Sequence, residues 1–335
     1  MAGLTSLALR RRAFFDVPMI LVVVLFFAVP TIDALSGSGI TSNTNNVQES
    51  SSQPSDRVLS QEFYKSVYKN IDSTNQEQRQ KVSTSGNDND DDFDTAPKIG
   101  GRTPWDLGNN KPQPAIKRAY EEGKIRGNVL DAGCGVGENC IFLADKYGIQ
   151  SVTGFDLSED AIQIAVNTVE SIAEEQKESP FWTTPKFLAA SCTEVADRHG
   201  EKLLSGIIDD DGISSTSNNN KLLFDVVIDS GLLHCLSKED AKEYVDQISK
   251  LVKPNTGRFY IGCFSTANPD PWDNPRRISE EYLRNELFSC REKWEVVSCR
   301  DCWWARPPTR GSSTGGAFSL ALWVEVRYLV PAKDD

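Results

Sequence analysis

The stretch "VLDAGCGVGEN", residues 129–139, decides the fold. An apolar run ends at Asp131, and Gly133, Gly135 and Gly137 follow it at alternate positions. A strand that leads through glycines into a helix is typical of α/β sheets that bind nucleotides outside the carboxyl ends of their strands. The spacing is G-x-G-x-G rather than the G-x-G-x-x-G of dinucleotide folds, and the carboxylate of Asp131 would repel a phosphate. The loop therefore favours a ligand with a cationic group.

The next predicted strand supports a nucleoside at the other end of that ligand. The stretch "VTGFDLSEDAIQIA", residues 152–165, places Asp156 at the end of the strand. A carboxylate there can accept hydrogen bonds from ribose hydroxyls. Leu157 can pack on the adenine, and Ser158 can cap the helix that follows. S-adenosylmethionine carries both an ammonium group and a nucleoside, so it would satisfy Asp131 and Asp156 together.

From residue 99 onward, predicted strands alternate with predicted helices. This alternation predicts a parallel sheet with helices on both faces. Only the polar stretch "PPTRGSSTGG" separates the last two strands, so we expect them to form a hairpin whose last strand is antiparallel. The predicted strands are 128–132, 150–155, 186–190, 224–229, 257–263, 294–300 and 318–329, and the predicted helices are 138–146, 159–175, 192–204, 238–251 and 280–287.

Composition restricts the partners. The chain has 335 residues, 25% of them charged, and a formal net charge of -12, which disfavours nucleic-acid surfaces. We expect a monomer that acts on a small molecule. Eight cysteines without a framework spacing are expected to be free thiols, and two histidines leave little material for a metal site. Cys299 and Cys302 lie three residues apart on a predicted strand and should point to opposite faces, so we predict no metal.

The amino terminus is predicted to be a separate region. Three arginines precede the apolar residues 14–32, which is typical of a signal peptide or signal anchor spanning residues 1–35. The apolar run would contact a membrane, and the signal would direct the chain to the secretory pathway or to an organelle such as a plastid. Residues 36–98 are expected to be a mostly disordered linker that contains a short amphipathic helix over 61–72. The globular domain covers residues 99–335, with a disordered insertion near 205–221.

Three stretches resemble motifs of the class I S-adenosylmethionine-dependent methyltransferases. They are "VLDAGCGVGENCIFLA", "VTGFDLSEDAIQIA" and "FDVVIDSGLLHCL", which are similar to the first, second and fourth motifs of that family. The resemblance covers residues 103–330. It implies an α/β, Rossmann-like, doubly wound seven-stranded sheet with an antiparallel last strand. It also implies that Asp131, Gly133 and Gly135 hold the methionine end of the cofactor and that Asp156 holds the ribose.

The adenine end departs from the family pattern. The family often has Asp after the third strand, whereas "FLAASCTEV" has Ser191 and Cys192 there. A serine hydroxyl or the backbone would then contact the adenine, beside Leu157.

The segment "GGRTPWDLGNNKPQPAIKRAYEEG", residues 100–123, precedes the glycine loop. The residues alone leave two interpretations open: an entry loop with Trp105 in a core gap, or a lid across the cofactor. The segment is similar to the amino-terminal signature of the branch that includes thiol, halide and thiopurine methyltransferases. That resemblance implies that Trp105 covers the active site near the methionine end, and that "SQEFYKSVYK" is the short helix before it.

Candidate acceptor-side residues follow the fourth predicted strand. In "DSGLLHC", Asp229 and His234 are candidate bases for a neutral hydroxyl or amine, although each also has a structural interpretation as a hydrogen-bonded group at the strand end. Arg276 and Arg277 could meet an anionic substrate, but a surface pair near a helix cap at Ser279 is the plainer interpretation. Cys134 is expected to be a small packed residue rather than a nucleophile.

Three functional hypotheses follow from these residues. The first is a small-molecule methyltransferase acting on a thiol or other soft nucleophile. The second is an O- or N-methyltransferase that uses His234 or Asp229 as the base. The third is a cofactor-binding protein without activity. An NAD-dependent oxidoreductase, which the loop spacing disfavours, would be protected against melting by NAD rather than by S-adenosylhomocysteine.

Overall fold

The computed structural model describes residues 63, 68, 105, 107, 110–176, 178–205, 223–270, 274–290, 292–306 and 318–330. The expected signal segment at 1–35 lies outside these residues. The same holds for the linker at 36–98 apart from Phe63, which is helical, and Tyr68, and for nearly all of the insertion at 205–221. Within the described part of the chain, no helix combines the length and apolar character needed to cross a membrane.

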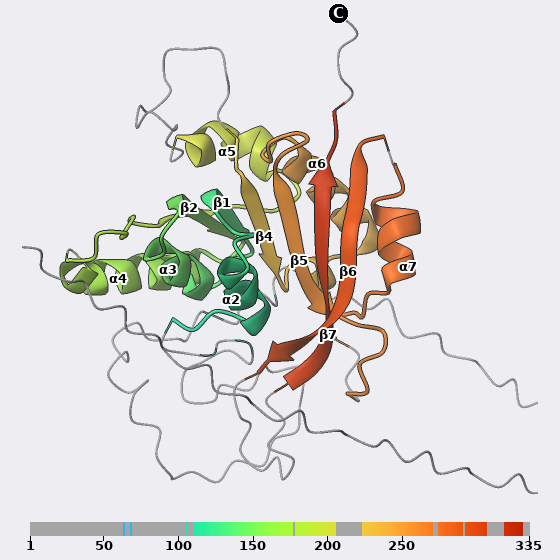
Figure 1. Cartoon of the computed structure of the whole chain (residues 1–335), viewed down its shortest axis with the longest axis horizontal. Helices are drawn as coiled ribbons and strands as arrows, with labels where there is room; N and C mark the ends of the chain where they lie inside the picture. Colours follow the sequence, from blue (N-terminus) through green and yellow to red (C-terminus); the bar gives the residue numbers. More distant parts are fainter. Residues whose placement is uncertain are drawn as a thin grey trace, which may run out of the picture. The chain divides into compact units, whose positions relative to one another are not determined.

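Seven strands form one sheet in the order β3-β2-β1-β4-β5-β7-β6 (Figure 1). Strands β1 to β5 are parallel, whereas β7 runs antiparallel to both β5 and β6. This confirms the predicted seven-stranded sheet and its antiparallel last strand. The strand bounds are β1 Gly127–Ala132, β2 Ile149–Asp156, β3 Lys186–Ala189, β4 Val226–Ser230, β5 Arg258–Phe264, β6 Trp294–Ala305 and β7 Phe318–Tyr328.

Helices cover both faces of the sheet, as the alternation predicted. One face packs against α2, α3 and α4, and the other against α5, α6 and the turn formed by α7 and η4. Because β1 lies between these layers, five of its six residues are buried. The helices are α2 Pro114–Glu121, α3 Glu138–Ala144, α4 Glu159–Gln176, α5 Val195–Leu204, η3 Leu233–Cys235, α6 Lys238–Ser249, α7 Glu280–Tyr282 and η4 Leu283–Leu287.

Serine hydroxyls start three of these helices. Ser158 and Ser279 accept the backbone N–H groups of Ala161 and Tyr282 at 3.2 and 3.0 Å, as predicted for both positions. Ser237 caps α6 in the same way. Each cap satisfies one of the free N–H groups in the first turn of its helix, which fixes where the chain turns from strand to helix.

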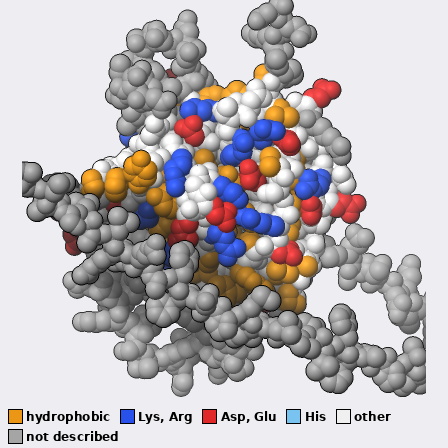
Figure 2. All heavy atoms as spheres, in the orientation of Figure 1, with side chains coloured by type: hydrophobic (Ala, Val, Ile, Leu, Met, Phe, Trp, Pro, Cys, Tyr) orange, Lys and Arg blue, Asp and Glu red, His pale blue; other side chains and the backbone are white. Residues whose placement is uncertain are grey.

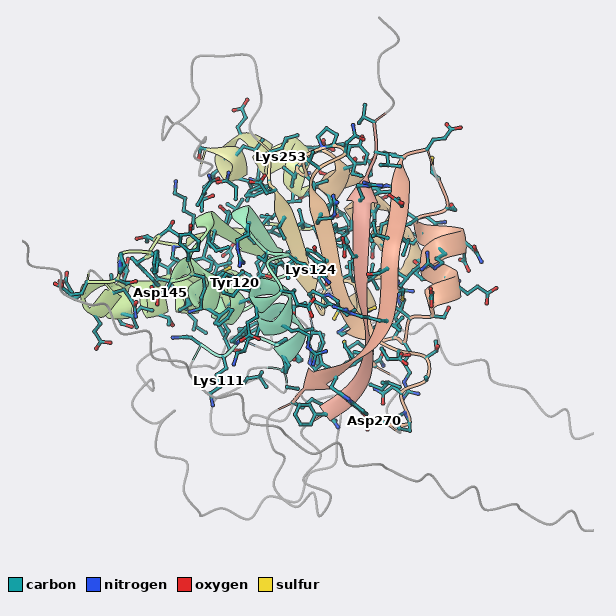
Figure 3. The ribbon with its side chains drawn as sticks, viewed as in Figure 1. Lys111, Tyr120, Lys124, Asp145, Lys253 and Asp270 are labelled. Carbon is teal, nitrogen blue, oxygen red and sulfur yellow. The ribbon has the colours of Figure 1, made fainter. Side chains whose placement is uncertain are left out.

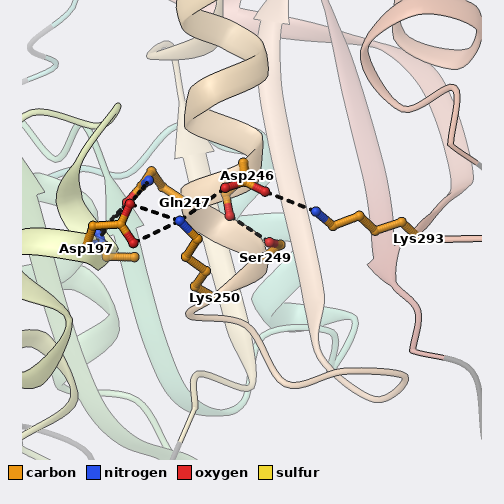
Figure 4. A network of polar contacts seen from close by, with 7 residues as sticks. Asp197, Asp246, Gln247, Ser249, Lys250 and Lys293 are labelled. Atoms are coloured by element: carbon orange, nitrogen blue, oxygen red, sulfur yellow. Dashed lines mark hydrogen bonds and ion pairs between the residues drawn. The ribbon is translucent and has the colours of Figure 1, made fainter.

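Helix α5 has no cap of its own and is started by α6 instead. The side-chain oxygen of Gln247 accepts the backbone N–H groups of Ala196 and Asp197, while its amide donates to the Asp197 carboxylate (Figure 4). Lys250 joins Asp197 to Asp246, and Lys293 extends the network to the start of β6. These exposed ion pairs add little stability individually, but the buried Gln247 fixes how α5 packs on α6.

The surface carries charges of both signs. On the face shown in Figure 2, Lys and Arg side chains alternate with Asp and Glu side chains. At one such cluster of charges, Glu122 pairs with Lys124 at 2.8 Å and with Arg300 at 3.6 Å. Hydrogen bonding to Lys124 and the nearby positive charges lower the pKa of the Glu122 carboxyl.

A buried glutamine ties the start of α2 to the end of β6. The Gln113 amide accepts the Ala305 N–H at 2.9 Å and donates to the Ala305 carbonyl at 3.0 Å. This pair of bonds replaces a missing sheet neighbour, because β6 is the edge strand. It also fixes the end of β6 beside Trp304, which lies against the ends of β4 and β5.

Replacing Gln113 with leucine should therefore destabilise the domain. The change leaves both backbone groups of Ala305 buried without a partner, so we expect the free energy of unfolding to fall by about 2 kcal/mol in urea denaturation. The control is Gln163→Leu, because Gln163 is exposed on α4 and bonds only Asn167 four residues away. Equal stability of the two variants would contradict a structural role for Gln113.

Candidate functional site

The glycine loop after β1 directs the amides of Gly133, Cys134, Gly135 and Gly137 to the protein itself. Gly133, Gly135 and Gly137 all adopt positive φ, at 69°, 53° and 82°. The N–H groups of Gly133 and Cys134 both donate to the carbonyl of Phe155 on β2, at 2.8 and 2.9 Å. A phosphate loop instead directs several amides at its anion. This loop is therefore built for close approach of a ligand rather than for binding a phosphate.

Asp156 takes up the next amide of the loop. Its two carboxylate oxygens accept the N–H groups of Gly135 and Ser158, both at 2.9 Å. Burial raises the pKa of the Asp156 carboxyl, although these backbone N–H groups oppose the rise. The carboxylate thereby lies at the tip of β2, where the sequence predicted it, and each oxygen retains capacity for a further hydrogen bond.

Asp131 is the acid that lacks a full set of partners. It is fully buried at the end of β1, and its Oδ1 has no hydrogen-bond partner among the described residues. Its Oδ2 accepts the thiol of Cys140, at 3.4 Å. Burial raises the pKa of Asp131 to about 7, and the charges of Asp229 and Asp156 add to the rise. A buried carboxylate with a free oxygen is costly unless a donor or cation binds there.

Two cysteines form the floor below this acid. A Cβ added at Gly154 on β2 would lie 2.8 Å from the sulfur of Cys134 and 2.9 Å from that of Cys140. Burial raises the pKa of the Cys134 thiol to about 11, so the group stays protonated at neutral pH. This supports the expectation that Cys134 is a packed residue and not a nucleophile.

Tyr68 and Trp105 lie over the loop and were not paired by the sequence analysis. Tyr68 is buried against Val136 and Ile164, and Trp105 packs on the same cluster. The Trp105 indole donates to the Tyr68 hydroxyl at 3.0 Å. That hydroxyl lies 3.0 Å from the position that a Cβ on Gly135 would take. Tyr68 therefore lies against the glycine loop, and Trp105 is held beside it through the Tyr68 hydroxyl. The spacing of the tyrosines in "EFYKSVYK" was the sequence feature that could have pointed to a buried position for Tyr68.

The predicted adenine-side residues follow β2 and β3. Leu157 is half-buried directly after Asp156, and Ser191 pairs its hydroxyl with that of Thr193 at 3.0 Å. Cys192 is buried in the core beneath α5 and α6, and burial raises the pKa of its thiol. Leu157 and Ser191 thus lie along the edge formed by the carboxyl ends of the strands, whereas Cys192 points into the protein.

Asp229 serves the backbone of the turn after β4. Its carboxylate accepts the N–H groups of Leu232, at 2.8 Å, and of Leu233, at 3.0 Å, so it starts the short helix η3. Burial raises the pKa of Asp229 to about 7 against those hydrogen bonds. The side chain is fully buried. This geometry matches the structural interpretation of Asp229 rather than a role as a base in contact with an acceptor.

His234 is held in one orientation and one tautomer. Its Nδ1 accepts the backbone N–H of Phe264 at 3.1 Å, and its ring stacks on the Phe264 ring at 4.5 Å. Burial, together with the charge of Arg276, lowers the pKa of His234 to about 3. A neutral imidazole that accepts at Nδ1 carries its proton on Nε2. That nitrogen lies 3.3 Å from the position of a Cβ on Gly231, at the end of β4.

Trp304 completes this side of the edge and was missed by the sequence analysis. It is buried with its ring 5.7 Å from His234 and 5.5 Å from Phe264. A Cβ at Gly231, where φ is 97°, would lie 2.9 Å from the Trp304 ring, so only glycine allows this approach. The signal was alternation along β6, where Trp303 is exposed and Trp304 is buried.

Comparison with known proteins identifies the family. A family described as a methyltransferase domain matches residues 108–325. The chain belongs to this methyltransferase family. A 2-heptyl-1-hydroxyquinolin-4(1H)-one methyltransferase of Mycobacteroides abscessus is 28% identical over 199 residues, which cover 59% of this chain and 71% of that protein. An uncharacterized methyltransferase of Schizosaccharomyces pombe is 27% identical over 168 residues, which cover 49% of this chain and 92% of that protein.

A solved structure shares the fold. It comes from work on the conversion of a disulfide bond into a thioacetal group during echinomycin biosynthesis. The two chains are 24% identical with a TM-score of 0.50, and the match covers 70% of this chain and 88% of that chain. The present chain is therefore an enzyme, a methyltransferase that uses S-adenosylmethionine and acts on a small molecule.

The residues at the strand ends fit this cofactor. The unpartnered Oδ1 of Asp131 suits a bound ammonium group, and the glycines leave room beside it. Asp156 would hold the ribose hydroxyls, and Leu157 and Ser191 would flank the adenine. Tyr68 and Trp105 would cover the methionine end. When bound, the cofactor supplies a methyl group on a positively charged sulfur.

Asp131 should make cofactor affinity depend on pH. Its carboxyl has a pKa of about 7, above the usual value, so it is increasingly protonated as pH falls below 7. Because an ammonium group binds the carboxylate, affinity for S-adenosylhomocysteine should fall by up to about tenfold per pH unit between pH 7 and 5.

Calorimetry on Asp131→Asn provides the test. The variant should bind weakly at all pH values and lose most of this slope. Asp301→Asn, an exposed site on β6, should behave like the parent protein. A parent-like slope in Asp131→Asn would assign the pH dependence to another group.

Proposed function

We propose that the methyltransferase accepts small molecules whose nucleophile is already deprotonated at neutral pH, with a thiolate as the first candidate. The observation that carries this proposal is the hydrogen bond from the Phe264 N–H to His234 Nδ1. This hydrogen bond occupies the lone pair on Nδ1, which His234 would need in order to accept a proton as a base. Asp229 has its oxygens on the backbone of η3. The two candidate bases are therefore engaged in structural hydrogen bonds.

An anionic nucleophile needs no base. Its lone pair forms the new bond to the methyl carbon as the carbon–sulfonium bond breaks, and sulfur keeps the bonding electrons, so no proton has to leave. The protein then contributes orientation and exclusion of water, and correct alignment alone is worth on the order of 7–11 kcal/mol. The Nε2–H of His234 can donate a hydrogen bond toward an acceptor at the end of β4.

The aromatic groups beside β4 and β5 support a planar acceptor. His234, Phe264 and Trp304 present three rings around Gly231. Flat conjugated molecules stack on such surfaces. Aromatic thiols, including thiopurine-like compounds, combine a planar ring with an acidic nucleophile. This agrees with placing the chain in the thiol, halide and thiopurine branch.

A second candidate is O-methylation of an acidic ring hydroxyl. The relative from Mycobacteroides abscessus is named for a 1-hydroxyquinolin-4(1H)-one, which is a planar ring with an N-hydroxyl group. Such a hydroxyl is acidic enough to arrive as an anion, so the same site would serve it without a base. We therefore group acceptors by the acidity of the nucleophilic group and the planarity of the ring, and not by whether the nucleophilic atom is sulfur or oxygen.

The pH dependence of turnover should follow the acceptor and not the enzyme. With two aromatic thiols of different acidity, the lower inflection of kcat against pH should shift with the thiol. Asn at His234 should lower kcat yet leave each inflection in place. His199→Asn is the matched control, because His199 is the second histidine of the chain and lies on α5. An inflection that is common to both thiols and disappears in His234→Asn would instead identify His234 as the base.

A further inference from the structure

We propose that Arg276 is the residue that recognises the negative charge of the acceptor. The inference rests on the proposed function, because it concerns the same acceptor site. The sequence analysis favoured a surface position for Arg276, and the structure corrects this: the side chain is only 7% exposed. A buried guanidinium needs an explanation, since arginine is rarely buried without a partner.

The partners of Arg276 do not neutralise its charge. No carboxylate of the described residues lies within 4.0 Å of its guanidinium, although Arg258, Arg284 and Arg327 all form such pairs. Its Nη2 donates a long bond of 3.4 Å to the Tyr282 hydroxyl, and its Cζ lies 5.0 Å from the centre of the Tyr282 ring. Its Nε is buried and has no hydrogen-bond partner among the residues described.

The positive charge of the buried Arg276 guanidinium is therefore only partly compensated by its neighbours. Removing a guanidinium from water is costly, and a single contact with an aromatic ring compensates only part of that cost. An anion that binds in the same place would supply the missing compensation. The free donor at Nε defines the chemical class of that ligand: a group with negative charge and a hydrogen-bond acceptor.

Arg276 belongs to the acceptor side of the edge. Its backbone N–H donates to the carbonyl of His234 at 3.1 Å, and its charge contributes to the low pKa of that histidine. Two residues later, Ile278 donates to the carbonyl of Phe264 at 2.8 Å. The guanidinium is thus carried by a segment that is bonded directly to both residues of the His234–Phe264 ring stack.

The loop that carries Arg276 is anchored to the last two strands. The carboxylate of Asp270, which is labelled in Figure 3, accepts the hydroxyl of Ser319 on β7 at 2.6 Å and lies 3.6 Å from Arg306, next to the end of β6. The backbone carbonyl of Asp270 accepts the Arg277 guanidinium. A second donor in this loop, Nδ2 of the buried Asn268, also has no partner among the described residues. The two arginines therefore differ: Arg277 holds the loop, while Arg276 has donor capacity to spare.

The inference narrows the acceptor to compounds whose anionic form is the one that binds. The charge can be the nucleophile itself or a group on the same small molecule. When the nucleophile is the anion, methyl transfer converts it to a neutral methylated product while the sulfonium becomes a neutral thioether. In that case Arg276 binds the substrate more tightly than the product, which makes it a specificity residue for the reactant state.

Matched probes can test this directly. The complex with S-adenosylhomocysteine is titrated at pH 8 with 4-nitrophenol, which is anionic there, and with 4-nitroaniline, which has the same shape and is neutral. The protein should prefer the anion, and Arg276→Gln should bind it about 10-fold to 100-fold more weakly while its affinity for the neutral probe stays unchanged. Arg276→Lys should retain part of the preference. Arg198→Gln, at an exposed arginine of α5 that pairs with Glu194, is the control and should bind both probes as the parent does.

The binding results either support or overturn the role of Arg276. Equal binding of the two probes by the parent, binding of neither, or an unchanged preference in Arg276→Gln would overturn the role of Arg276. Thermal melting and S-adenosylhomocysteine affinity are measured on every variant, and a folding loss confined to Arg276→Gln leaves the comparison to Arg276→Lys. Methyl transfer to aromatic thiols, followed as product, tests the proposed function separately, because it can persist when the preference for anions is lost.

Discussion

The site depends on one carboxylate that holds two backbone amides. Asp156 accepts the N–H groups of Gly135 and Ser158, so it joins the glycine loop after β1 to the helix start after β2. The loop is also bonded to Phe155, one residue earlier. These bonds consume the amides that a phosphate would need and leave Asp131 as the free acceptor. The choice of a cationic nucleoside over a nucleotide therefore follows from where the loop amides are directed, and not from the glycines alone.

At the ends of β4 and β5, where the acceptor would bind, side-chain packing rather than backbone hydrogen bonding sets the geometry. Trp304 reaches the end of β4 because Gly231 has no side chain to block it. Trp304 is in turn positioned by the end of β6, which Gln113 fixes from the start of α2. A residue that precedes the glycine loop in the chain thus controls an aromatic ring on the opposite half of the sheet.

The sequence predicted what local chemistry determines. The order of strands and helices, the antiparallel last strand, the serine caps at Ser158 and Ser279 and the acids at the tips of β1 and β2 all follow from residue pattern and turn chemistry. The bounds were less exact, since β6 extends to Ala305 rather than to residue 300 and α2 was not among the predicted helices. Tyr68 could not be placed, because its contact with Gly135 joins positions separated by 67 residues through tertiary packing. The burial of Arg276 was not predicted, because the sequence "PRR" at residues 275–277 is equally typical of an exposed turn. Only the bonds from Arg276 and Ile278 to the backbone of His234 and Phe264 show that this turn is folded inward.

The charged side chains at the carboxyl ends of the strands differ in sign between the two halves of the site. Acids line the half formed by β1 and β2, whereas the buried guanidinium of Arg276 lies beyond β5, so the edge favours a cation at one end and an anion at the other. A sulfonium donor and an anionic acceptor match this polarity, and each loses its charge at the reacting atom when the methyl group moves. The products then have weaker electrostatic attraction to the site than the reactants had. The ammonium group of the cofactor is unchanged by the reaction, so with the proposed role of Arg276 only the acceptor side would lose a charged partner.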